Sequence, residues 1–354
     1  IFMMMLLAVL SFAACSDDDD PNENVISEYT HNDQIVAAQK AKSGKNEAVL
    51  LVAFGSTWTN AFAAFDETKK AYEQAFPNAD VYFCFSSDIC INRASAGEHG
   101  EKRDYYEPRY LLHAIGAAKY SKVYVQSLQV IPGEEFANVV AAVKKFANNG
   151  YVKDAHLDDE YLKTVEIHLG MPLLNDLDEV DDVAKLLNDL YHEEAAQGVV
   201  AFMGHGNPDN YDSFKANIRY TQLEKALQTY SKNYYVGTVD MKDNYKQNVM
   251  ARMQNNNITS GKVYLHALMS IAGDHAHNDM AGEGNDYWDA SEPTSEDNSW
   301  FEFFNHNGFT SVVPQTNGNP LGLLELPTIR QIWINHTKNA ELLEDAYHSM
   351  YPEE

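Results

Sequence analysis

The chain has 354 residues, a formal net charge of −26 at pH 7 and 45% hydrophobic residues. This length and composition predict two domains with sizeable cores. The large negative charge argues against nucleic acid or an anionic membrane surface as a partner, because both carry negative charge themselves.

The first fifteen residues have the pattern of an export signal. Residues 3–12 are apolar but too short to span a bilayer, and small residues precede Cys15. Residues 10–15 resemble a bacterial lipobox, in which the cysteine becomes the lipidated first residue. The alternative is a plain secretory signal with a chance cysteine. We expect residues 1–15 to be a lipoprotein signal peptide and the mature protein to lie in the cell envelope, anchored to the outer membrane or on the periplasmic side through lipidated Cys15.

Residues 16–46 are polar and have little periodicity. The aspartate run at 17–20 indicates an acidic tether, and the rest is expected to be a linker with one short helix near 33–42. Two further cysteines, Cys84 and Cys90, lie near the end of a predicted strand. They could form a disulfide in an oxidising compartment, and the alternative is two small buried thiols.

From residue 47 onward, strand patterns alternate with helix patterns. Strands are expected at 48–54, 81–85, 123–128, 199–205, 234–239 and 262–268. Helices are expected at 61–75, 110–119, 136–148, 179–191, 212–230 and 245–255. Such alternation predicts βαβ units and therefore an α/β fold built on parallel sheets.

The two halves of this region repeat each other. Residues 122–135 align without gaps with residues 262–275, and the two segments share Lys, Val, Tyr, Leu, Ile and Gly at matching positions. The strand before Ser56 likewise matches the strand before His205. We therefore predict two duplicated parallel-sheet α/β domains with an active-site cleft between them.

The repeat also sets the expected boundaries. The N-terminal α/β domain is predicted at 47–175, and the C-terminal α/β domain, which carries the metal ligands, at 176–330. Residues 331–354 are expected to form a C-terminal helix that packs on the N-terminal domain. The acidic segment 283–298 is expected to be an insertion beside the active site, forming a lid.

The matching strand ends carry different chemistry in the two halves. Ser56 and Glu135 stand in the first half where His205 and His275 stand in the second. Because ligands bind at the carboxyl ends of parallel strands, the two imidazoles are expected to converge on one metal. Asp240, which closes the next strand, is the third candidate ligand. Two histidines and a carboxylate with an open position suit divalent cobalt, iron, nickel or zinc.

Each of these residues also has a structural alternative. His205 could be a turn histidine bonded to its neighbours, and His275 a surface histidine in a polar loop. Asp240 could cap a helix N-terminus. Glu135 could be an acid in the first turn of a helix, where the helix dipole favours negative charge.

Five segments carry a family resemblance: Gly204-His205-Gly206, 237–240, 271–276, 278–282 and 131–135. Together they resemble the anaerobic-type sirohydrochlorin cobaltochelatases, the CbiK-like class II chelatases, from about residue 48 to 334. Gly-Asp-His-Ala followed by Asn-Asp-Met-Ala-Gly is the most specific part. The resemblance implies that His205 and His275 bind the metal, that Asp240 occupies an acidic position usually filled by glutamate, and that Glu135 is an acidic active-site residue.

The implied activity is insertion of a divalent metal into a tetrapyrrole such as sirohydrochlorin, with cobalt as the first candidate metal substrate and iron, nickel and zinc as others. His205, His275 and Glu135 would be catalytic, because a neutral histidine can both hold a metal and accept a pyrrole proton. The alternative is an envelope lipoprotein that binds a tetrapyrrole or metal for uptake without turnover. The sequence leaves open whether the protein is a homo-oligomer.

Overall fold

The computed structural model describes residues 23–151, 153–212, 214–283 and 298–343. The signal peptide, Cys15, the acidic tether and most of the predicted insertion lie outside these residues. Among the described residues, no helix combines the length and apolar character needed to cross a bilayer.

The N-terminal unit is built on a five-stranded sheet with the order β2-β1-β3-β4-β9. Its strands are β1 (Glu47–Ala53), β2 (Ala79–Phe85), β3 (Lys122–Ser127), β4 (Glu166–Gly170) and β9 (Glu341–Leu342). The first four are parallel, and the short β9 is antiparallel to β4.

The C-terminal unit is built on a four-stranded parallel sheet with the order β6-β5-β7-β8. Its strands are β5 (Val199–Gly204), β6 (Tyr234–Thr238), β7 (Gly261–Ala267) and β8 (Phe309–Val312). In each sheet the first four strands of the unit follow the same spatial order: second, first, third, fourth. The predicted pair of parallel-sheet α/β domains is therefore confirmed, and the shared order agrees with a duplication.

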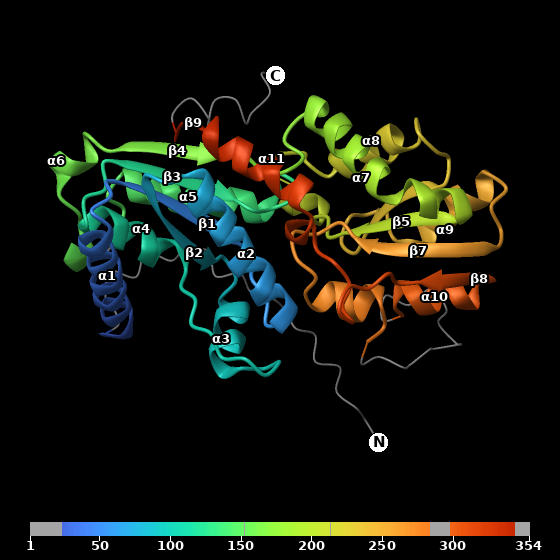
Figure 1. Ribbon diagram of the computed structural model, residues 1–354, viewed down its shortest axis with the longest axis horizontal. Helices are drawn as coiled ribbons and strands as arrows, with labels where there is room; N and C mark the ends of the chain where they lie inside the picture. Colours follow the sequence, from blue (N-terminus) through green and yellow to red (C-terminus); the bar gives the residue numbers. More distant parts are fainter. Residues whose placement is uncertain (1–22, 152, 213, 284–297, 344–354) are drawn as a thin grey trace.

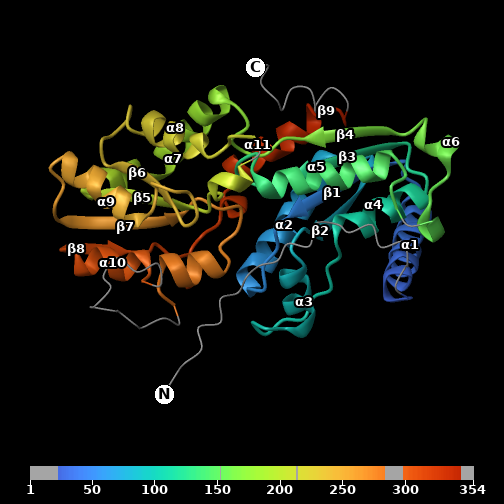
Figure 2. The ribbon, with the colours of Figure 1, turned by 180° about the vertical axis from the view of Figure 1, so that it is seen from behind.

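Helices cover both faces of the sheets (Figures 1 and 2). Those of the N-terminal unit are α1 (Glu23–Ser43), α2 (Thr59–Ala75), α3 (Asp88–Ala96), α4 (Pro108–Ala117), α5 (Glu134–Ala147) and α6 (Asp159–Leu162). They are followed by α7 (Leu177–Gln197), α8 (Ile218–Leu227), α9 (Lys246–Asn255), α10 (Trp300–His306) and α11 (Pro327–Lys338). Side chains alternate along β1, so Val49 and Leu51 pack in the core beneath α2 while Leu50 and Val52 pack beneath α4 and α5.

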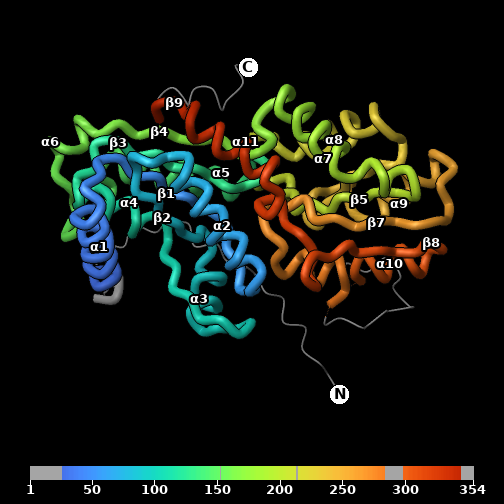
Figure 3. Tube along the Cα trace, in the orientation of Figure 1, coloured from blue at the N-terminus to red at the C-terminus, as the bar shows by residue number. Residues whose placement is uncertain are grey.

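The apolar core beneath α2 continues into the C-terminal unit, where it includes Phe202 and Tyr220. Helix α11 contacts α7 on one side and β3, β4 and α2 on the other, and Figure 3 shows it between the two units. The Trp333 indole Nε1–H donates to the carbonyl of Gln129 at 3.2 Å. Helix α11 begins at Pro327 and ends at Lys338, so it covers only the first part of the helix expected over 331–354, of which residues 344–354 lie outside the described residues.

Residues 23–43 form the long helix α1, so the short helix expected near 33–42 is confirmed but begins ten residues earlier, and the expected linker is wrong for residues 23–32. Tyr29 and Val36 are buried against the α4 side of the N-terminal unit, and Asp33 Oδ1 lies 2.8 Å from His113 Nδ1. The segment has few apolar residues, so its helical pattern is weak in the sequence. The helix is stabilised by contacts with residues distant in the chain, which local periodicity does not reveal.

Candidate active site

His205 directly follows β5, and the two glycines around it have different functions. A Cβ on Gly204 would lie 2.4 Å from Tyr220 Cε1, so only glycine allows this close packing. Gly206 adopts φ +81°, a left-handed conformation that favours glycine. The chain therefore turns sharply at the end of the strand, and the His205 side chain remains 48% exposed.

Asp240 reaches His205 because β5 and β6 are adjacent and parallel, with Gly204 opposite Thr238. Beyond the last ladder pair, the Asp240 amide donates to the His205 carbonyl at 2.9 Å. The Asp240 carboxylate Oδ2 then lies 3.5 Å from His205 Nε2. Helix α9 begins at Lys246 after Tyr245, so the alternative that Asp240 caps a helix is wrong.

His275 is the first residue of a short π-helix, His275–Met280, in the segment that follows β7. Because β7 pairs with β5, this segment leaves the sheet beside His205. The two imidazole centroids are 4.8 Å apart, and the ring planes meet at 77°. The structure thus brings together His205, His275 and Asp240, which are separated by up to 70 positions in the sequence numbering.

Asp279 is a functional candidate that the sequence analysis did not single out. Its Oδ2 lies 2.5 Å from His275 Nδ1, one turn along the π-helix. π-Helical turns are rare and occur frequently at functional sites. The available signal was the spacing of four residues between a histidine and an aspartate, which places both on one helical face.

Both histidines have Nδ1 engaged by an oxygen acceptor. His205 Nδ1–H donates to the Gly206 carbonyl at 2.7 Å, and His275 Nδ1–H donates to Asp279. In a neutral imidazole the other ring nitrogen then carries the free lone pair. These hydrogen bonds therefore leave Nε2 of each ring available to a metal or a proton.

The two histidines differ in basicity. The protein atoms packed around the His205 ring lower its pKa by removing water from it, although the side chain keeps 48% of its surface exposed, and the neighbouring His275 lowers the pKa further. Burial also opposes protonation of His275, but the hydrogen bond and charge of Asp279, with Asp240 and Asp274, outweigh it and raise the pKa of that ring. The site therefore combines one histidine that remains neutral with one that takes up a proton more readily.

The site is open. The side chains of His205, His275 and Asp240 are all about half-exposed. Across the described ranges, no group of three or more His, Cys, Asp or Glu side chains is arranged so that it could hold a metal ion, so the predicted ligand set of His205, Asp240 and His275 is not assembled as a three-ligand site in this structure. The arrangement is therefore a pair of imidazoles with a carboxylate beside each, accessible from solvent, and not a closed structural metal site.

Residues 47–341 match the model of the family described as cobalt chelatase (CbiK). This match covers most of the chain. The protein belongs to the CbiK cobalt chelatase family.

Two curated relatives resemble this cobalt chelatase family member over much of its length. The sirohydrochlorin cobaltochelatase CbiKC of Nitratidesulfovibrio vulgaris is 28% identical over 246 residues, which are 68% of this chain and 78% of that protein. The sirohydrochlorin cobaltochelatase of Salmonella typhimurium is 25% identical over 297 residues, 83% of this chain and 96% of that protein.

Among solved structures, SirB from Bacillus subtilis with Fe3+ is similar with a TM-score of 0.50 at 13% identity. The similarity covers 83% of this chain and 95% of SirB. At this identity the likeness supports the two-domain fold alone. The family match begins at the first residue of β1, so helix α1 lies outside the matched region.

Glu135 lies in the N-terminal unit, at the start of α5. It lies in the first turn of α5, which agrees with the alternative that it is an acid at a helix N-terminus. Its Oε2 accepts a hydrogen bond from Ser86 Oγ at 2.8 Å. Burial raises the pKa of Glu135, although the Ser86 hydrogen bond partly opposes this. The preceding amide, that of Glu134, donates to Asn207 Oδ1 at 3.1 Å. The start of α5 thus abuts the turn after His205, while the Glu135 carboxylate contacts the end of β2.

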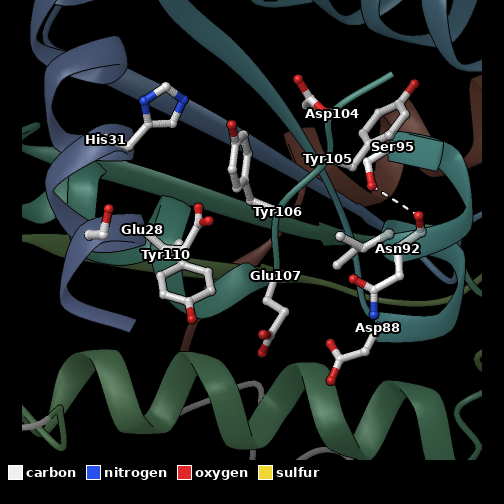
Figure 4. Close-up of a pocket in the computed structure, with 12 residues that line it drawn as sticks. Glu28, His31, Asp88, Asn92, Ser95, Asp104, Tyr105, Tyr106, Glu107 and Tyr110 are labelled. Carbon is white, nitrogen blue, oxygen red and sulfur yellow. Dashed lines mark hydrogen bonds between the residues drawn. The ribbon is translucent and has the colours of Figure 1, made fainter. Parts of the chain in front are cut away.

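Two cavities lie in the N-terminal unit and at its border, and His205, His275 and Asp240 are not among the described residues that line them. The larger, of about 680 Å³, lies between α1, α3 and residues 104–110 and is rich in acidic and tyrosine side chains (Figure 4). The smaller, of about 510 Å³, joins Trp58 and His99 to residues 316–319 of the C-terminal unit. The histidines therefore lie on an open surface beside the domain junction, outside both cavities.

The described cysteines Cys84 and Cys90 are both free, so the disulfide alternative is wrong. Cys84 is buried in the core beneath α4, and Cys90 is partly buried in α3. Burial raises the pKa of both thiols, which keeps them protonated and unreactive at neutral pH.

Proposed function

We propose that this protein inserts a divalent metal, cobalt first, into a tetrapyrrole such as sirohydrochlorin, with the metal as a substrate. The observation that carries the proposal is the pair of half-exposed imidazoles, with centroids 4.8 Å apart, in which the hydrogen bonds at Nδ1 leave the lone pair of each neutral ring on Nε2. Membership of the cobalt chelatase family and the two relatives named sirohydrochlorin cobaltochelatase support it. Iron, nickel and zinc suit the same ligands.

Insertion requires the metal to lose bound waters and the macrocycle to lose two pyrrole N–H protons. His205, whose lowered pKa keeps it neutral, offers its Nε2 lone pair to the incoming metal. His275, whose basicity Asp279 increases, accepts a pyrrole proton at Nε2. Asp240 beside His205 offsets part of the metal's positive charge. The metal dication replaces the two protons, so charge is balanced in the product.

Glu135 is proposed as a second proton acceptor at the edge of the site. Its raised pKa brings its titration closer to neutral pH than that of an ordinary glutamate. Ser86 and the start of α5 hold it on the N-terminal side of the junction. A macrocycle lying across the junction would be accessible to His275 from one unit and to Glu135 from the other.

Multiple turnover tests this proposal. The purified protein is mixed with an excess of sirohydrochlorin and Co²⁺, and loss of the metal-free macrocycle is followed by absorbance against a protein-free control. We expect many equivalents of cobalt product for each protein molecule, at a rate well above the control. Product formation that stops at one equivalent would instead support the alternative, an uptake lipoprotein that binds without turnover.

The location is part of the proposal. We propose that the mature protein is held in the cell envelope through lipidated Cys15, because an apolar run precedes this residue and an aspartate run follows it. The same export signal also supports the alternative function, an envelope lipoprotein that binds a tetrapyrrole or metal for uptake without turnover. To test the anchor, the wild type and Cys15→Ser are expressed in cells. The cells are then fractionated, and the N-terminus of each protein is determined by mass spectrometry.

For the wild type we expect membrane-associated protein whose first residue is a lipidated Cys15. For Cys15→Ser we expect the unlipidated protein in the soluble fraction. Wild-type protein that carries an unmodified residue other than Cys15 at its N-terminus would contradict the anchor and leave the chelatase proposal unaffected.

A further inference from the structure

A stack of three rings joins the two units beside the active site. The Trp58 indole, in the connection between β1 and α2, lies against the His277 imidazole of the π-helix, with centroids 3.6 Å apart and planes 2° from parallel. On its other side it stacks on His99, with centroids 4.2 Å apart. His99 is fixed in turn by Thr57 Oγ1, 2.6 Å from its Nδ1.

Polar contacts reinforce this stack from the N-terminal unit. The Trp58 Nε1–H donates to Asp274 Oδ1 at 2.6 Å, and Arg93 Nη1 lies 3.5 Å from Asp274 Oδ2. Asn60 Nδ2 donates to the carbonyl of Ala272 at 3.4 Å. The N-terminal unit thus contacts the C-terminal segment immediately before His275 through three side chains.

Trp58 contacts the chain on both sides of His275. It hydrogen-bonds to residue 274 and stacks on residue 277, which is fully buried and whose Nδ1 lies 2.7 Å from Glu283 Oε2. Rotation or sliding of the π-helix would break the stack and the hydrogen bond together. The position of His275 is therefore set both by its own sheet, through β7, and by a side chain of the other unit.

We propose that Trp58 is a positioning residue that holds the π-helix so that His275 stays opposite His205. The inference rests on the proposed function for its relevance to catalysis, but its effect on metal affinity can be measured without a macrocycle. Trp58 lies two residues after Ser56, which matches His205, so it belongs to the N-terminal loop equivalent to the loop that carries His205. The two copies of this loop would therefore have different functions. The C-terminal copy carries the ligands, and the N-terminal copy holds one of them in place.

A double-mutant cycle in Co²⁺ binding tests this proposal, with affinity measured by calorimetry on the full chain. Trp58→Ala should weaken Co²⁺ binding about tenfold, in the range found when groups that orient a metal ligand are removed. Trp58→Phe keeps a ring for stacking and loses only the indole N–H, so it should weaken binding by about threefold. In a His275→Ala background, both changes should have no further effect, because the residue on which Trp58 acts is gone.

Tyr230→Ala is the matched control, because it removes an exposed aromatic ring near the end of α8 and should leave Co²⁺ affinity unchanged. Equal weakening of Co²⁺ binding by Trp58→Ala with and without His275 would overturn the proposal, as would unchanged affinity in folded Trp58→Ala. If Trp58→Ala does not fold, the same cycle with Trp58→Phe decides. A wild-type protein without turnover would contradict the proposed reaction. The Co²⁺-binding cycle would still test the positioning role of Trp58, because it needs no macrocycle.

In the chelation assay, Trp58→Phe should lower kcat more than it raises KM for the macrocycle, since it displaces a reacting group and leaves the macrocycle surface intact. A change confined to KM would show that Trp58 contacts the macrocycle directly and would overturn the positioning role.

Discussion

Replacing either His205 or His275 with alanine should lower Co²⁺ affinity by at least about 100-fold and reduce chelation to the protein-free rate, because each ring supplies one of very few metal ligands. The two ring centroids lie 4.8 Å apart, and the hydrogen bonds at Nδ1 leave Nε2 of each ring as the atom that can bind the metal. Calorimetry with Co²⁺ and initial chelation rates measure the two effects.

His192→Ala is the control for this pair. It removes an exposed histidine of α7 whose Nδ1 lies near backbone carbonyls of its own helix, so affinity and rate should be unchanged. A double variant lacking both active-site rings should bind Co²⁺ little worse than either single variant if the rings share one ion. Two separable binding events, each lost with one histidine, would contradict a shared site.

Asp279→Asn should lower the chelation rate by about tenfold or more and move the acid limb of the pH profile to lower pH. The sign follows from the His275 environment. Asp279 raises the pKa of this ring, so the wild-type rate should rise with pH through a value above the ordinary 6.5 of histidine. Without the carboxylate charge, the His275 pKa falls, and the ring becomes neutral at a lower pH.

The lower maximum chelation rate expected for Asp279→Asn has a different cause from the shift of the acid limb. An asparagine side chain can place an N–H toward Nδ1 of His275, which disfavours the tautomer with Nε2 free. Asp240→Asn is the comparison, because Asp240 lies beside the other ring and should change the height with a smaller shift of the limb. Initial rates from pH 5.5 to 8.5 under conditions where chemistry is rate-limiting provide the measurement. An unmoved limb in Asp279→Asn would exclude His275 as the titrating base.

The sequence predicted the parts of the molecule that depend on local patterns and on the repeat. The strands leading to His205 and to His275 are apolar runs with clear ends, and their duplication predicted adjacent strand ends in each sheet. The spatial order of the strands agrees with that repeat. His205 lies near Asp240 because β5 and β6 are adjacent and parallel, so that their carboxyl ends lie side by side.

The parts that escaped prediction depend on contacts between distant residues. Asp279 is four positions from His275, but the hydrogen bond between their side chains depends on a π-helix, which the hydrophobic periodicity of the sequence does not predict. Trp58 and Asp274 are 216 positions apart, and their hydrogen bond exists only because the two units meet at this surface. Helix α1 extends well beyond the short helix expected near 33–42, since its stability comes from its contacts with α4 and β2. Glu135 lies at the start of α5, and its hydrogen bond to Ser86, 49 positions away, depends on the packing of α5 against the end of β2.

The most direct test of the shared site is anomalous scattering from crystals soaked in Co²⁺, collected on both sides of the cobalt absorption edge. We expect one strong cobalt peak within about 2.1 Å of Nε2 of both His205 and His275, the usual distance from an imidazole nitrogen to such a metal. Asp240 should lie at or near the same ion. A cobalt peak on one histidine alone, or peaks only at other sites of the chain, would contradict a metal site shared by His205 and His275.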